Sequence, residues 1–68
     1  MNMPSITDRV KEFIEEAIFS GAYEPGSRIK EKQVASTLQI SRPPVREAFK
    51  LLEADGLVVR KPRCGIFV

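Results

Sequence analysis

The stretch from residue 40 to residue 54 reads Ile-Ser-Arg-Pro-Pro-Val-Arg-Glu-Ala-Phe-Lys-Leu-Leu-Glu-Ala, and its pattern decides the fold class. Apolar residues recur at the spacing i, i+3, i+4 and i+7, which is typical of the buried face of a helix. They are Val45, Ala48, Phe49 and Leu52. Pro43 and Pro44 fit the first turn, where the amides have no partner inside the helix. The pattern therefore predicts a helix that begins after Ser41 and ends at Asp55-Gly56.

Two further helices are predicted before this one. Ser5 is followed by Asp8 in the arrangement of a capping box, and an apolar stripe then continues to a stop near Gly21. The members of this stripe are Ile6, Val10, Phe13, Ile14, Ala17 and Ile18. A second helix is predicted from Glu31 to Leu38, with no good capping residue at its start.

The remaining segments favour β-structure. Pro25-Gly26 marks a turn, and residues 27–29 are predicted to form a very short strand. Residues 57–60 and 65–68 are rich in β-branched and aromatic side chains and predict a hairpin around the polar loop 61–64. The order helix, short strand, helix, turn, helix, strand, strand predicts a mainly α fold with a small β-hairpin. We interpret residues 1–68 as one winged helix-turn-helix domain, with three helices plus a wing.

Composition excludes several classes of protein. A chain of 68 residues has room for one compact domain. Its longest apolar run is far short of the roughly 20 residues that cross a bilayer, and it lacks a signal-peptide layout. We therefore expect a cytoplasmic protein with no membrane partner. With no histidine, and with Cys64 as the one cysteine, the chain lacks the residues of a structural zinc site or a common catalytic triad. We expect neither an enzyme nor a bound metal or cofactor.

Charge is unevenly distributed, although the net charge is only +2. Residues 1–27 hold two basic and five acidic side chains, whereas residues 28–68 hold nine basic and four acidic ones. Arg42, Arg46 and Lys50 recur every four residues and so share one exposed stripe of the third helix. A basic helix of this kind fits the major groove of double-stranded DNA, where an arginine can bond to guanine through two donors.

Other interpretations of these charges remain open from the residues alone. The stripe could serve solubility only, with Arg46 paired to Glu47 or Glu53. Lys61 and Arg63 in the hairpin loop could follow a phosphate backbone or enter a minor groove, or could simply keep an exposed strand pair from aggregating. The domain as a whole could also be a winged-helix module that binds an acidic protein partner.

Longer motifs in the sequence are specific enough to show a resemblance to one protein family. They are Pro25-Gly26-Ser27-Arg28-Ile29-Lys30-Glu31, Val34-Ala35, Ser41-Arg42-Pro43-Pro44-Val45-Arg46-Glu47-Ala48 and Gly65-Ile66-Phe67-Val68. Together they resemble the N-terminal DNA-binding domain of GntR-type bacterial transcription regulators. The resemblance covers nearly the whole chain, and the Pro-Val-Arg-Glu-Ala sequence is most similar to the FadR/FCD branch.

The resemblance implies roles for individual residues. Arg42 and Arg46 would approach bases in the major groove, Lys32 would contact DNA from the second helix, and Ser41 would meet a phosphate. The wing tip around Arg63 to Gly65 would reach the minor groove. The full set of candidate DNA-binding residues is Lys32, Ser41, Arg42, Pro43, Pro44, Arg46, Lys50, Lys61, Arg63 and Gly65.

Two positions depart from the family pattern. Members usually have threonine where Pro43 stands, so a hydroxyl contact to the DNA backbone is lost here. They usually have glycine where Gln39 stands, in a turn that tends to need a positive φ. A glutamine in that conformation costs about 1 kcal/mol.

The resemblance also implies a longer protein. Regulators of this family continue into a C-terminal effector-binding and dimerisation domain of about 150 residues, which is absent from this chain. The whole regulator is then expected to respond to a metabolite and to bind a palindromic operator as a homodimer, while the 68-residue chain is expected to be monomeric.

Overall fold

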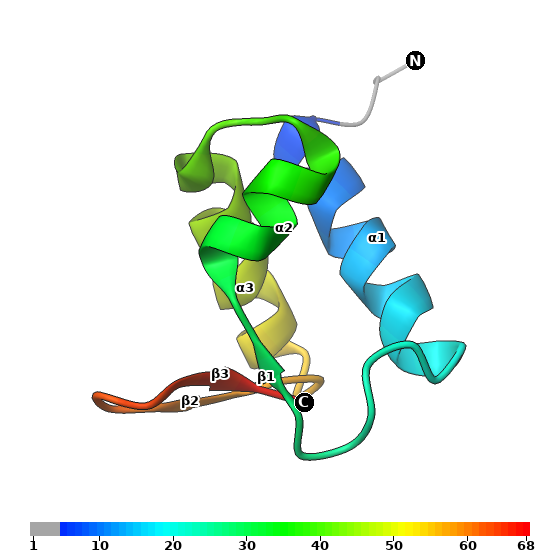
Figure 1. Ribbon diagram of the computed structural model, residues 1–68, viewed down its shortest axis with the longest axis vertical. Coiled ribbons are helices and arrows are strands. Elements are labelled where there is room, and N and C mark those ends of the chain that lie inside the picture. The colour runs from blue at the N-terminus through cyan, green and yellow to red at the C-terminus, as the bar shows by residue number, and fades with distance from the viewer. Residues whose placement is uncertain (1–4) are drawn as a thin grey trace.

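The computed structural model describes residues 5–68 and shows three helices with a small sheet at one end (Figure 1). The helices are α1 (Ile6–Phe19), α2 (Glu31–Leu38) and α3 (Arg42–Ala54), and the strands are β1 (Arg28–Ile29), β2 (Val59–Lys61) and β3 (Gly65–Phe67). This is the predicted order of elements, and the winged helix-turn-helix fold is confirmed. No helix among residues 5–68 is long and apolar enough to cross a membrane.

α1 begins with the predicted capping box. The amide of Asp8 donates to Ser5 Oγ at 3.1 Å, and the amide of Ser5 donates to Asp8 Oδ2 at 3.3 Å. Val10 and Ile14 are buried. Ile6, which the apolar stripe included, is 55% exposed. Ile6 is the first residue of α1, so this end of the predicted apolar stripe lies at the surface.

α2 ends in a Schellman motif built on a glutamine. Gln39 has φ 56°, its amide donates to the carbonyl of Ser36 at 3.2 Å, and the amide of Ile40 donates to the carbonyl of Ala35 at 3.0 Å. The predicted positive φ at this position is therefore confirmed. A left-handed conformation without glycine costs roughly 1–2 kcal/mol, and the two hydrogen bonds offset part of that cost.

α3 ends in the same motif, which shifts the start of the hairpin. The amide of Gly56 donates to the carbonyl of Glu53 at 3.1 Å, and the amide of Leu57 donates to the carbonyl of Leu52 at 3.0 Å. Leu57 therefore completes the helix end and does not enter the sheet. The predicted first strand of the hairpin, residues 57–60, is corrected to Val59–Lys61.

The sheet has β3 in its centre, with the strand order β1-β3-β2 and both pairs antiparallel. Ile66 lies opposite Ile29 in one pair, and the amide of Val68 donates to the carbonyl of Ser27 at 2.9 Å just beyond it. The sequence predicted the hairpin of β2 and β3 but not the addition of β1 to it. This pairing holds the segment that leads into α2 against the wing.

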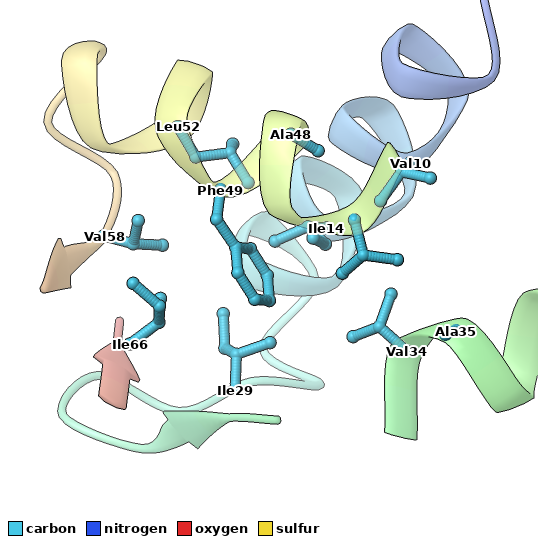
Figure 2. Close-up of a cluster of buried hydrophobic side chains, with 11 residues drawn as sticks. Val10, Ile14, Ile29, Val34, Ala35, Ala48, Phe49, Leu52, Val58 and Ile66 are labelled. Carbon is cyan, nitrogen blue, oxygen red and sulfur yellow. The ribbon is translucent and has the colours of Figure 1, made fainter. Parts of the chain in front are cut away.

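One hydrophobic core joins the helices to the sheet. Its buried members are Val10, Ile14, Ile29, Val34, Ala35, Val45, Ala48, Phe49, Leu52, Val58 and Ile66. In Figure 2 the ring of Phe49 extends from α3 toward Ile29, with Val58 and Ile66 on one side. Phe13 and Tyr23 pack against this core while half-buried, as expected for residues at its edge. All four predicted apolar positions of α3 are buried, so the opposite face of that helix is available to a partner.

Candidate nucleic-acid interface

The exposed face of α3 carries the predicted basic stripe. The side chains of Arg42, Arg46 and Lys50 are 54%, 57% and 65% exposed. They recur once per helical turn, so they form a ridge along the helix rather than a dispersed charge. The predicted stripe is confirmed.

The start of α3 is also exposed. Ser41 is the N-cap residue, but its hydroxyl makes no capping hydrogen bond, because Pro43 and Pro44 in the first turn have no amide N–H to donate. Pro43 is exposed and Pro44 half-buried. The Ser41 hydroxyl is thus available to an external acceptor such as a phosphate oxygen.

One carboxylate contacts both arginines of the ridge. Oε1 of Glu31, the first residue of α2, accepts a hydrogen bond from Nε of Arg42 at 2.7 Å and another from Nε of Arg46 at 3.0 Å. Partial burial acts to raise the pKa of Glu31, but the two arginines outweigh it and hold that pKa below its usual value. The contact fixes the start of α2 to the first two turns of α3.

The pairing of Arg46 with Glu47 or Glu53, one of the alternatives open from the sequence, is wrong. Glu47 lies 3.4 Å from Lys50, and Glu53 lies 3.7 Å from Arg60 of β2. Adjacent residues on a helix point in different directions, which keeps Glu47 away from Arg46. The partner of Arg46 is Glu31, which belongs to α2.

A basic hollow of about 390 Å³ opens between α2, α3 and the sheet. Its lining holds six cationic side chains, from Arg28, Lys30, Lys32, Arg42, Arg46 and Arg60, against the single carboxylate of Glu31. Ile29, Phe49 and Ile66 also line it, so the hollow adjoins the core. An excess of fixed positive charge in a concave surface attracts polyanions and raises their local concentration.

Three cationic residues of this hollow, Arg28, Lys30 and Arg60, were not among the site residues predicted from the sequence, and neither was its one acidic residue, Glu31. A signal for two of them exists, because Arg28 and Lys30 are two residues apart in an extended segment, so their side chains lie on the same face. Arg60 had no such signal. Its position follows from the pairing of β2 with β3 opposite Ile66.

The structure brings together four of the predicted site residues in this hollow, namely Lys32, Arg42, Arg46 and Gly65. Ser41, Pro43 and Pro44 lie at the start of α3, and Lys50 lies further along it. Lys61 and Arg63 lie at the wing tip, outside the lining of the hollow. The predicted set therefore forms a central group with flanking positions at both ends.

The wing tip has a defined shape. The amide of Cys64 donates to the carbonyl of Lys61 at 3.0 Å, and Arg63 adopts a positive φ of 65°. Nζ of Lys61 lies 4.8 Å from the centre of the Phe67 ring, a cation–π contact. The turn thus holds two exposed cations beside the edge of the basic hollow, where Gly65 begins β3.

A helix-turn-helix with a basic α3, followed by a hairpin with a basic tip, defines a winged-helix protein of the nucleic-acid-binding kind. The sequence model described as "Bacterial regulatory proteins, gntR family" matches residues 6–68. The chain therefore belongs to the GntR family of bacterial regulatory proteins. Because the proteins of this family are transcription regulators, the expectation that the chain is not an enzyme is confirmed.

Similar proteins support the same assignment. The chain is 44% identical over 55 residues to the uncharacterized HTH-type transcriptional regulator YdhC of Bacillus subtilis, with 81% of this chain and 25% of that protein covered. It is 41% identical over 61 residues to the histidine utilization repressor of Pseudomonas aeruginosa, with 88% and 24% covered. The chain thus spans about a quarter of the length of these relatives.

A solved structure has the same fold. The crystal structure of a GntR transcriptional regulator from Rhodococcus sp. RHA1 matches 91% of this chain and 30% of its own, with a TM-score of 0.88 and 40% identity. At this identity the likeness extends beyond the fold to the sequence of the domain.

Proposed function

We propose that this domain binds double-stranded DNA and reads its sequence by placing α3 in the major groove. The observation that carries the proposal is the pair of exposed guanidiniums, Arg42 and Arg46, held at one carboxylate oxygen in the N-terminal half of α3. In helix-turn-helix proteins this part of the second helix meets the bases, and arginine pairs with O6 and N7 of guanine through two donors.

The surrounding cations would contact the backbone. Lys32 and Lys30 flank the arginines from the α2 side, Arg28 and Arg60 from the sheet side, and Lys50 from further along α3. Contacts to phosphates position a protein on DNA without reading sequence. These residues would therefore supply affinity and orientation, while Arg42 and Arg46 supply discrimination.

The start of α3 and the wing would complete the contact. The Ser41 hydroxyl has no capping bond to break before it meets a phosphate. Pro43 and Pro44 would bring the backbone of the first turn close to the duplex. Lys61, Arg63 and Gly65 would follow the backbone into the adjacent minor groove, where a glycine permits close approach and cations are attracted.

Selection of preferred duplexes from a random pool, followed by salt titrations, tests the proposal. The chain should enrich a defined sequence, and its affinity should fall steeply with salt as counterions are released. Arg9→Ala, an exposed substitution on α1, is the matched control and should leave the selected sequence unchanged. A chain that binds no duplex at low salt but captures an acidic protein surface would instead support the protein-binding function.

We further propose that the chain is the N-terminal domain of a longer, cytoplasmic, metabolite-responsive regulator of the FadR/FCD branch. Support comes from the Pro44–Ala48 sequence and from the quarter of its relatives' length that the chain spans. Such a regulator would pair as a homodimer through its C-terminal domain on a palindromic operator, and an all-helical C-terminal domain in the full-length protein would support the branch.

Sedimentation of the 68-residue chain at tens of micromolar tests where dimerisation resides. A monomer is expected, with affinity for one half-site near the micromolar range typical of non-specific binding. Fusion to an unrelated dimerisation module should then restore orders of magnitude of affinity on a palindrome but not on one half-site. A tight dimer of the chain alone would contradict this account.

A further inference from the structure

Glu31 is an acidic residue in the middle of a surface that otherwise favours polyanions. It is the only acidic residue that lines the basic hollow, and its side chain is 21% exposed. A carboxylate there repels phosphates and weakens any purely electrostatic binding. A carboxylate at this position therefore lowers the affinity for DNA, unless it also improves binding in some other way.

The geometry of its two hydrogen bonds suggests what this improvement is. Arg42 and Arg46 both use Nε, the donor nearest the side-chain stem, and both reach the same oxygen, Oε1 of Glu31. Within residues 5–68 the terminal nitrogens of these two guanidiniums make no hydrogen bond. Those terminal nitrogens are enough for a bidentate contact with O6 and N7 of guanine.

The carboxylate also limits the freedom of both side chains. A free arginine loses considerable rotamer entropy when a base fixes it in one geometry. Arg42 and Arg46 are held on the same side of α3 before any ligand arrives, so part of this loss has already occurred. Since Glu31 belongs to α2, the orientation is set by a different helix from the one that carries the arginines.

We propose that Glu31 is a specificity-determining positioning residue, which holds the guanidiniums of Arg42 and Arg46 with their terminal nitrogens free for base reading. The inference rests on the proposed DNA-binding function. Glu31 itself contacts neither base nor phosphate. It lowers the overall affinity for DNA and increases the discrimination between DNA sequences.

The Glu31→Gln variant provides the test, with affinities measured for the preferred duplex and for random duplex. Loss of the negative charge should raise affinity for random duplex, while the less ordered arginines should bind the preferred duplex less well. The ratio of the two affinities should fall about tenfold, within the range that a bidentate arginine contact contributes. Glu12→Gln removes the same charge from the exposed face of α1 and should leave the ratio unchanged.

A second set of variants separates positioning from a structural role. In a chain that carries Arg42→Ala and Arg46→Ala, Glu31→Gln should no longer change the ratio, because there is nothing left to position. Glu31→Asp keeps the charge but shortens the reach to the arginines, so it should also lower the ratio, and it provides the readout if Glu31→Gln does not fold. Circular dichroism confirms folding of each variant.

Several outcomes would overturn the inference. An unchanged ratio in Glu31→Gln and Glu31→Asp would mean that the carboxylate does not set discrimination. An equal rise in both affinities would mean that Glu31 only weakens binding. A wild-type chain without any sequence preference would defeat the proposed function itself, and this result is visible before any variant is made.

Discussion

The side chain of Arg28 occupies the space that a side chain at residue 65 would need. A Cβ built on Gly65 would lie 2.8 Å from Nε of Arg28 and 3.2 Å from its Nη2. The two residues belong to neighbouring strands, β1 and β3, and both line the basic hollow. The absence of a side chain at Gly65 therefore lets the Arg28 guanidinium lie against the start of β3, next to the wing tip.

Gly65→Ala is expected to affect stability and DNA binding together. Gly65 has φ 119°, and a side chain in such a conformation costs about 1–3 kcal/mol. Arg28 is flexible enough to move aside, so the new methyl group should displace its guanidinium from the hollow and weaken DNA binding at least as much as Arg28→Ala does. Denaturant unfolding and duplex titration measure the two effects.

Gly56→Ala is the matched control for this substitution. Gly56 also has a positive φ, 79°, but no atom lies within 4 Å of a Cβ built there. The Gly56→Ala substitution should lower the stability of the domain by roughly 1 kcal/mol and leave the affinity of the folded domain for DNA unchanged. DNA binding by Gly65→Ala that matched the wild-type chain would contradict the displacement of Arg28.

Arg46→Ala and Arg42→Ala should each relax the sequence preference. Loss of one bidentate contact should cost about 1–3 kcal/mol on the preferred duplex and remove discrimination at particular base pairs. Competition with duplexes that carry single base-pair changes measures this loss position by position. If Arg46→Ala weakened preferred and random duplexes equally, the base-reading role would have to be abandoned.

Lys50→Ala should weaken binding without changing preference. Lys50 lies a turn beyond Arg46 on α3, where phosphates are closer than base edges, and its 3.4 Å contact with Glu47 is exposed and weak. We expect all duplexes to lose affinity alike and the salt slope to decrease by roughly one unit. A changed base-pair preference in this variant would instead place Lys50 at the base edges.

Tyr23 should titrate above its ordinary value, because burial raises the pKa of its phenol from 10.0. The folded state then holds the proton more tightly than the unfolded state does. The contribution of Tyr23 to the stability of the folded state is fully present below about pH 10, and it is lost as the pH rises through the raised pKa of the folded chain. Tyr23 is the one tyrosine and the chain has no tryptophan, so phenolate absorbance reports it directly.

Two reference titrations show whether folding raises the pKa of Tyr23. The same chain in urea should titrate near the ordinary value, and Tyr23→Phe should remove the absorbance change. Coincident titration curves in the folded and unfolded states would show that the half-buried ring leaves its hydroxyl in water.

The amino-acid sequence by itself determined the helices, their ends and the exposed basic stripe. The Ser5–Asp8 capping box and the buried face of α3 depend on residues within about four positions of one another, whereas the left-handed Gln39 was expected only from the family resemblance. Side-chain chemistry and helical period are local properties, so they can be predicted before the chain folds. Arg42, Arg46 and Lys50 share a face for the same reason.

The tertiary structure alone decided which groups surround that stripe. Glu31 reaches Arg42 and Arg46 across 11 and 15 residues of chain, and Arg28 crosses Gly65 from another strand. None of these contacts follows from sequence spacing, because each depends on how α2 packs against α3 and how β1 joins the hairpin. Packing of the common core brings these distant side chains within hydrogen-bonding distance, and only then does a set of dispersed cations become one concave basic surface.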